Sequence, residues 1–140
     1  MSGSAYANGG GKYVATLADI EKIEAIPFAD RNLPSTTYEM LRNGASLAPA
    51  APALSFFIRA SDYAQPFVWS HADLLRDITR AANAFRRLGI ERGDVIAFVL
   101  PNLPETHFVI WGGEAAGIAF AINPLLDSRQ IASRSPPVHR

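Results

Sequence analysis

Apolar residues recur at helical spacing between Ser70 and Gly89. They fall at i, i+4, i+7, i+8, i+11 and i+14, which is one face of an α-helix. These positions are Leu74, Ile78, Ala81, Ala82, Phe85 and Leu88. Ser70 and Asp73 have the spacing of a capping box at the start of this helix. Gly89 is placed to end it in a Schellman turn, with Ile90 available for the accompanying apolar contact.

Two unbroken apolar runs flank a second helical segment. Val95–Leu100 and Ile118–Ile122 show no polar alternation, which is typical of strands covered on both faces in a parallel sheet. Between them, Asn102 is placed to cap a helix that has Pro104 in its first turn and ends at Gly117. Strand, helix and strand in this order predict a right-handed βαβ unit. The predicted fold class is α/β, with a parallel strand pair that forms an incomplete piece of a larger α/β domain.

Shorter segments precede this unit. Ala53–Ile58 and Phe67–Trp69 are rich in strand formers, and the polar residues 61–66 between them favour an N-terminal β-hairpin. Residues 1–34 contain one short stretch of helical spacing, Leu17–Ile26. We expect these residues to form an extension that carries one short amphipathic helix on the surface.

The last dozen residues show no apolar period. Gln130–Ala132 could begin a helix, but two adjacent prolines forbid a helix shortly afterwards. A chain of alternating strands and helices normally covers its last strand with another helix, and the pattern offers none. Residues 129–140 are therefore predicted to be an irregular tail that follows a folded region of residues 35–128.

The composition is that of an ordinary folded domain without an overall electrostatic preference. The 140 residues are 49% hydrophobic and 19% charged, which excludes a disordered chain. Thirteen Lys and Arg balance thirteen Asp and Glu, so we expect no nucleic-acid partner. The absence of cysteine excludes a disulfide and a thiolate nucleophile. It also fits a reducing compartment, and we expect a cytoplasmic location.

One apolar stretch, residues 108–126, is nearly as long as a membrane span. Glu114 lies in its middle, three glycines interrupt it, and Asn123-Pro124 closes it. A spanning helix needs about 20 residues without charges. A buried helix followed by a buried strand explains the stretch better, so we expect no membrane span. The N-terminus also lacks the basic and apolar regions of a secretory signal.

Two glycine-rich segments have incomplete nucleotide-binding patterns. Gly9–Lys12 has the glycines and lysine of a phosphate loop but lacks the preceding strand, and Tyr13 stands where Ser or Thr is needed. Gly112, Gly113 and Gly117 have the wrong spacing for a dinucleotide fingerprint, and they lie within and at the end of a helix rather than before one. Close packing of that helix is the better explanation for these three glycines.

The polar side chains form no catalytic or metal-binding pattern. The three histidines, His71, His107 and His139, are scattered and have no metal-ligand spacing with carboxylates. The basic residues of the first helix, Arg76, Arg80 and Arg87, are interpreted as a solvated face, because no aromatic residues for base stacking are interleaved with them. No catalytic residue and no metal ligand is therefore assigned, and cofactor-binding residues stay unidentified.

Several short segments in a fixed order carry a family resemblance. They are Phe67–Ser70, Ala81–Ile90, Glu91–Ala97, Leu100–Glu105, Ala116–Ala119 and Ile122–Leu125. Together they resemble the beginning of the AMP-dependent synthetases and ligases, the acyl-adenylate-forming superfamily, and most closely its acyl-CoA synthetases. The resemblance covers roughly residues 35–128, which it identifies as the N-terminal part of an AMP-binding domain. None of these segments is catalytic in the family.

The resemblance implies a two-step ligase for carboxylic acids, such as those of fatty acid metabolism. A carboxylate attacks the α-phosphate of ATP to form an acyl-adenylate and pyrophosphate, and a thiol, usually of CoA, then displaces AMP. The family handles ATP and Mg²⁺ with a Ser/Thr/Gly-rich loop ending in lysine, with later acidic motifs and with a C-terminal lysine. None of these maps onto this sequence. We therefore expect an N-terminal fragment of an acyl-CoA synthetase that holds no cofactor of its own and is inactive alone.

Two other interpretations stay open. The chain could be a non-catalytic α/β interaction module that binds a partner, or a second copy of itself, through an exposed apolar sheet. It could also be an unrelated nucleotide-binding α/β domain, although Pro101-Asn102 stands where such a domain has a glycine-rich turn. The sequence does not identify the carboxylic acid.

Overall fold

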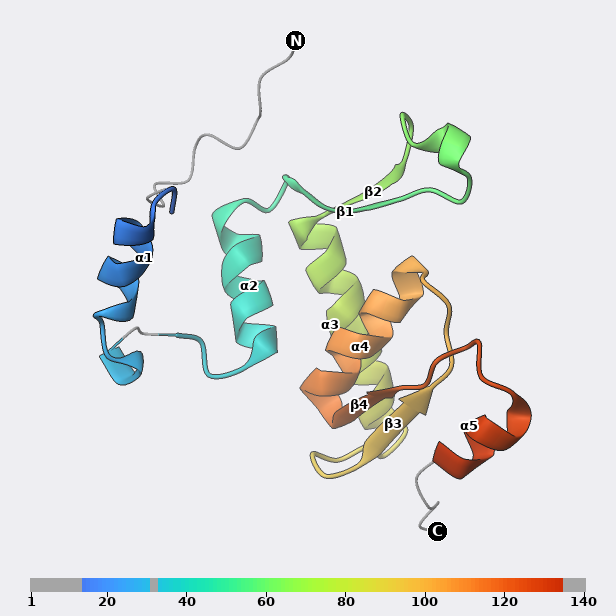
Figure 1. Cartoon of the computed structure of the whole chain (residues 1–140). Helices are drawn as coiled ribbons and strands as arrows, with labels where there is room; N and C mark the ends of the chain where they lie inside the picture. The colour runs from blue at the N-terminus through green and yellow to red at the C-terminus, as the bar shows by residue number, and fades with distance from the viewer. Residues whose placement is uncertain (1–13, 31–32, 135–140) are drawn as a thin grey trace. The chain divides into compact units, whose positions relative to one another are not determined.

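The structure, a computed structural model, describes residues 14–30 and 33–134 (Figure 1). The chain divides into two compact units, residues 1–35 and residues 36–140. In the first unit, helix α1 spans Leu17–Glu24 and is followed by a 3₁₀ turn, Phe28–Asp30. Thr16 caps α1, because its hydroxyl accepts a hydrogen bond from the Asp19 amide at 3.3 Å. The short amphipathic helix expected over residues 17–26 is confirmed, and it ends two residues earlier than expected.

The second unit begins with a helix that the hydrophobic pattern of the sequence did not predict. Helix α2 spans Thr37–Leu47, and the Thr36 hydroxyl accepts a hydrogen bond from the Glu39 amide at 3.1 Å. One side of the helix packs inward through Ala45, which is buried. The short length of α2 and its Asn43-Gly44 pair weaken the local helical signal, since both residues are poor helix formers.

A β-hairpin follows, as predicted. Strands β1, Pro52–Phe56, and β2, Phe67–Ser70, pair antiparallel with Phe56 opposite Phe67. The ring of Trp69 contacts the ring of Phe108 edge to face, with the two centroids 6.1 Å apart. This contact joins the hairpin to a helix that lies much later in the chain.

Helix α3, His71–Arg87, confirms the sequence prediction at both ends. At its start, the Asp73 amide donates to the Ser70 hydroxyl at 3.1 Å, and the hydroxyl donates to the Asp73 carboxylate at 2.6 Å. At its end, Gly89 has a φ of +88°, and the Ile90 amide donates to the Phe85 carbonyl at 3.1 Å. Together with the bond from the Gly89 amide to the Arg86 carbonyl at 3.0 Å, this bond makes the predicted Schellman turn.

The predicted βαβ unit is also present. Strand β3, Val95–Phe98, and strand β4, Ile118–Ala121, are parallel, and helix α4, Pro104–Ala116, connects them. In the register, Ile96 lies opposite Ala119. Helices α3 and α4 pack side by side (Figure 1). The buried apolar residues form the core of the second unit, and they are Ala45, Ile78, Ala82, Ile96, Ala116 and Ile122.

The two faces of the β3–β4 sheet differ in burial. Toward α4, the Ile96 side chain is 9% exposed, and its Cδ1 approaches the position that a Cβ at Gly113 would take. Alternate residues point to the opposite face of a strand, and there Val95, Ile118 and Phe120 are 40%, 50% and 38% exposed. We call this surface, Val95, Ile118 and Phe120, the outer sheet face. One face of the strand pair is therefore covered and the other is exposed, as expected for an incomplete piece of a larger α/β domain.

Two predictions at segment ends are wrong. Helix α4 is preceded by Leu103 and not capped by Asn102. The Thr106 hydroxyl organises this turn by donating to the Pro101 carbonyl at 2.5 Å. In the predicted irregular tail, residues 129–134 instead belong to helix α5, Ser128–Arg134. The Asp127 carboxylate nucleates this helix, since it accepts the amides of residues 129 and 130 at 2.9 Å.

The apolar stretch of residues 108–126 contains the end of α4 and all of β4, as expected for a helix followed by a strand. Across the described ranges, no helix combines the length and hydrophobicity that crossing a membrane requires. Residues 135–140, the rest of the predicted tail, lie outside the described residues.

Candidate functional site

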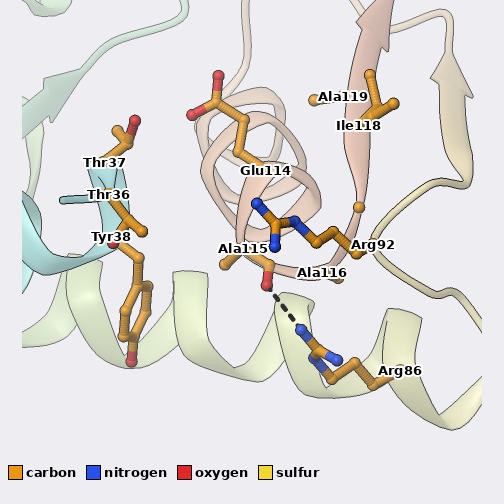
Figure 2. Close-up of a pocket in the computed structure, with 11 residues that line it drawn as sticks. Thr36, Thr37, Tyr38, Arg86, Arg92, Glu114, Ala115, Ala116, Ile118 and Ala119 are labelled. Atoms are coloured by element: carbon orange, nitrogen blue, oxygen red, sulfur yellow. Dashed lines mark hydrogen bonds between the residues drawn. The ribbon is translucent and has the colours of Figure 1, made fainter.

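A cavity of about 790 Å³ opens where strands β3 and β4 begin. Its wall combines the start of α2, the ends of α3 and α4, and the first residues of β4 (Figure 2). The polar and charged residues that line it are Thr36, Thr37, Tyr38, Arg86, Arg92 and Glu114. We call it the basal cavity, because it lies at the amino-terminal edge of the parallel strand pair.

Arg86 is held in place at the cavity wall. It lies in the last turn of α3, and its Nη2 donates a hydrogen bond to the Ala115 carbonyl oxygen at 3.2 Å, drawn in Figure 2. That carbonyl belongs to the last turn of α4, where the helix dipole favours a positive charge. The bond thus ties α3 to α4, and the other N–H groups of the guanidinium stay available.

The side chains of Arg92 and Glu114 line the same cavity without a hydrogen bond or ion pair to any residue that the structure describes. Arg76 and Arg80 of α3 differ, because each of them contacts a carboxylate. Arg76 contacts Asp73 at 2.5 Å, and Arg80 contacts Asp77 at 3.2 Å. The basal cavity therefore contains two guanidinium groups that contact no carboxylate.

The start of α2 forms a fixed, polar part of the wall. The Tyr38 hydroxyl and the Thr79 hydroxyl lie 2.8 Å apart in a hydrogen bond that connects α2 to α3. The Thr79 hydroxyl donates its one proton to the Leu75 carbonyl at 2.7 Å, so the Tyr38 hydroxyl is the donor to Thr79. Amides in the first turn of a helix have no acceptor within the helix, and Thr37 and Tyr38, which line the cavity, belong to the first turn of α2.

The opposite edge of the sheet is the usual ligand-binding edge of α/β proteins, because their ligands bind outside the carboxyl ends of the strands. Here the polar side chains close local turns. The side-chain oxygen Oδ1 of Asn123 accepts a hydrogen bond from the Leu125 amide at 2.9 Å. Thr106 and Asp127 are engaged in the turns before α4 and α5. These contacts shape the edge, and none of these residues is assigned to a ligand.

The perturbed titratable groups serve helix ends rather than a reaction centre. The hydrogen bond from the Ser70 hydroxyl lowers the pKa of Asp73 below its ordinary value, and Arg76 lowers it further. In α1, the hydrogen bond from the Thr16 hydroxyl lowers the pKa of Asp19. Both carboxylates stand at the start of a helix, where a negative charge is favourable.

Of the histidines considered in the sequence, His71 begins α3 and His107 lies in the first half of α4. His139 and the glycine-rich segment Gly9–Lys12 lie outside the described residues. Among the residues with described positions, no three His, Cys, Asp or Glu side chains gather into a group that could hold a metal ion. The basal cavity was not predicted from the sequence, because its residues come from five separate segments.

Comparison with known proteins identifies a related family. Residues 41–135 match the family described as AMP-binding enzyme. The chain is 37% identical over 122 residues to marinolic acid–CoA ligase of Pseudoalteromonas sp. (strain SANK 73390), a match that covers 86% of this chain and 18% of that ligase. The chain thus spans about a fifth of the length of the curated relatives it matches.

Solved structures share this fold. A Mycobacterium tuberculosis fatty acyl CoA synthetase superposes with a TM-score of 0.56 at 25% identity, over 69% of this chain and 18% of that chain. The N-terminal subdomain of Klebsiella oxytoca NpsA superposes with a TM-score of 0.59 over 69% of this chain and 24% of its own. At 15% identity the second match supports the fold alone.

Proposed function

Because the chain belongs to the AMP-binding enzyme family, the AMP-dependent synthetases and ligases, we propose that it is the N-terminal part of an acyl-CoA synthetase. The observation that carries this proposal is the 37% identity to marinolic acid–CoA ligase over 122 residues. The name of that relative describes the joining of a carboxylic acid to CoA. A cytoplasmic location is part of the proposal, supported by a sequence without cysteine.

The proposed reaction uses ATP to activate a carboxylic acid as an acyl-adenylate and then transfers the acyl group to the thiol of CoA. The sequence contains no Ser/Thr/Gly-rich loop ending in lysine that would bind the phosphates in this family. Magnesium, which the family implies, has no matching ligand set among residues 14–30 and 33–134. We propose that this chain supplies no step of the reaction itself and that its role is structural.

That structural role follows from the βαβ unit. Helix α4 covers one face of the β3–β4 pair, and α3 supports α4 from the other side. In the proposed enzyme, this unit holds one part of the sheet next to the parts that bind ATP and the acid. Alone, the chain is proposed to be inactive.

An exchange assay tests the proposed inactivity. The purified chain of 140 residues is incubated with ATP, Mg²⁺, labelled pyrophosphate and a panel of short, long and aromatic carboxylic acids. We expect no acid-dependent incorporation of label into ATP. Incorporation above the level without acid would contradict the proposed inactivity and would place an adenylation site within this chain.

A chimera tests the proposed enzyme class separately. The 122-residue segment of marinolic acid–CoA ligase that matches this chain is replaced by the corresponding segment of this chain. We expect the chimera to keep acid–CoA ligase activity, because the two segments serve the same structural role. The control is a second chimera that also carries Gly112→Ala, a substitution that crowds the contact between α3 and α4. If the first chimera, which keeps Gly112, folds but is inactive, the proposal is contradicted.

A second candidate function, a non-catalytic interaction module, is favoured by one observation. The outer sheet face exposes three large apolar side chains side by side, and such a patch favours association. Sedimentation velocity at increasing micromolar concentrations distinguishes the candidates. Specific, saturable dimerisation would support an interaction module, whereas a monomer at all concentrations would contradict self-association.

A further inference from the structure

We propose that the basal cavity binds a phosphate group between Arg86 and Arg92. The carrying observation is the presence of two guanidinium groups that line one cavity and contact no carboxylate among the described residues. Guanidinium groups bind phosphate oxygens by charge-assisted hydrogen bonds in a fixed geometry. A cavity of about 790 Å³ leaves room for the phosphate group of a small molecule.

The position of Arg86 suits this role. Its bond to the Ala115 carbonyl fixes the side chain before any ligand arrives, and a prearranged donor loses less conformational freedom on binding. Arg92 lies in the turn that leads into β3 and has no described partner to give up. Binding at Arg92 therefore does not require an existing ion pair to break.

The rest of the wall adds hydrogen-bond donors. Thr37 and Tyr38, the first two residues of α2, line the cavity, and amides in the first turn of a helix have no acceptor within the helix. The bond between Tyr38 and Thr79 fixes the start of α2 against α3. The positive end of the α2 dipole adds to the attraction of the two arginines for an anion.

Glu114 gives the cavity a negative charge and sets the expected selectivity. Its carboxylate lines the cavity with Arg86 and Arg92, so the three side chains sum to one positive charge. This charge suits a single phosphate group, whereas a second phosphate next to it would be repelled by the Glu114 carboxylate. Neutralising Glu114 should therefore strengthen phosphate binding.

The location separates this site from the proposed ligase reaction. The basal cavity is lined by Ile118 and Ala119 at the beginning of β4, whereas reactants of α/β enzymes bind beyond the carboxyl ends of the strands. The proposed ligand is therefore an accessory one, either free phosphate or a phosphate monoester. This inference does not depend on the proposed function.

The test is an NMR titration of the ¹⁵N-labelled chain with inorganic phosphate at constant ionic strength. We expect saturable shifts of the Arg86 and Arg92 side-chain N–H signals and of the amides of residues 36–38. Methyl phosphate in a second titration distinguishes a monoester from free phosphate by its relative affinity. Acetate is expected to bind more weakly, and acetate binding as tight as phosphate binding would overturn the assignment to phosphate.

Two matched variants make the titration decisive. Arg92→Gln is expected to weaken phosphate binding about tenfold or more. Arg87→Gln removes the same charge from a neighbouring arginine that bonds to the Asn83 carbonyl and does not line the cavity, and it should leave the affinity nearly unchanged. Equal losses in the two variants would overturn the proposal, as would the absence of saturation.

A third variant tests the role of Glu114. Glu114→Gln removes a negative charge from an exposed residue of the wall and is expected to strengthen phosphate binding by about two- to fivefold. Unchanged backbone signals outside the cavity verify that the variant keeps its fold. Weaker phosphate binding by Glu114→Gln would contradict the proposed arrangement of charges.

Discussion

Gly112 of α4 lies so close to Ala81 of α3 that a Cβ atom built on the glycine would stand 2.7 Å from the Ala81 Cβ. The same atom would stand 2.9 Å from the Ile78 carbonyl oxygen. Contacts this short do not occur between real side chains, and a backbone oxygen in a packed helix cannot move away easily. Glycine inside a helix costs about 1 kcal/mol, and here the close approach of two helices offsets that cost.

Gly112→Ala is predicted to destabilise the second unit. The added methyl group must separate α3 from α4, and overpacking of this kind costs about 1–3 kcal/mol. The matched control is Gly44→Ala in α2, where an added Cβ meets no atom within 4 Å. The control should gain about 0.5–1 kcal/mol. Urea unfolding followed by circular dichroism measures both changes, and equal effects would contradict the packing argument.

Gly89→Ala is predicted to weaken the end of α3. Gly89 has a φ of +88°, a conformation that costs a residue with a Cβ about 1–2 kcal/mol. The control is Gly93→Ala, where the added Cβ meets open space and φ lies outside the left-handed region. It should change the unfolding free energy by less than about 0.5 kcal/mol. Chemical unfolding of the two variants side by side measures the difference.

Acid is predicted to destabilise the start of α3. The Ser70 hydroxyl and Arg76 lower the pKa of Asp73 in the folded chain. The Asp73 carboxylate therefore binds a proton more readily in the unfolded chain than in the folded chain. Its contribution to the free energy of unfolding is fully present above its ordinary pKa of 3.8 and is lost as the pH falls through the lowered pKa of the folded chain. Unfolding free energies measured between neutral pH and about pH 2.5 should fall below about pH 4.

Ser70→Ala tests the cause of this acid sensitivity. Removing the hydroxyl should raise the pKa of Asp73 toward its ordinary value, because the largest stabiliser of the carboxylate is lost. A carbon-detected NMR titration of the Asp73 carboxyl group measures the shift. Ser55→Ala, at an exposed position of β1, is the control and should leave the titration of Asp73 unchanged. An unchanged Asp73 pKa in Ser70→Ala would refute this explanation.

Polar substitutions on the outer sheet face are predicted to reduce self-association. Val95→Thr combined with Ile118→Thr keeps β-branched side chains in both strands but removes apolar surface. Val68→Thr, at an exposed position of the hairpin, is the control. Sedimentation velocity should show less association for the double variant than for the control at equal concentration. Similar association would exclude the outer sheet face as the contact.

The parts of the fold that are determined by residues close together in the sequence could be predicted. Helix α3 is specified by a capping box at its start and Gly89 at its end, and both signals lie within a few residues of the bonds they form. The apolar runs predicted β3 and β4 for the same reason. Helix α2 was missed although Thr36 and Glu39 have the spacing of a capping box, because the helix is short and contains Asn43-Gly44.

The basal cavity could not be predicted, because its chemistry depends on residues brought together by the fold. The sequence indicates only that Arg86 is a cation suited to the end of α3 and that Arg92 belongs to a turn. Only the positions of α2 and α4 bring them to a common cavity. The start of α4 was mispredicted for a related reason, since the bond from Thr106 to Pro101 replaced the expected cap by Asn102.

The contact between Trp69 and Phe108 makes the hairpin depend on the rest of the second unit. An isolated two-stranded hairpin is at best marginally stable in water. Here the ring of Phe108 in α4 packs against Trp69 of β2, and α3 contacts both strands. Because the hairpin packs on both α3 and α4, we expect the hairpin and these two helices to unfold in a single cooperative transition rather than one after the other.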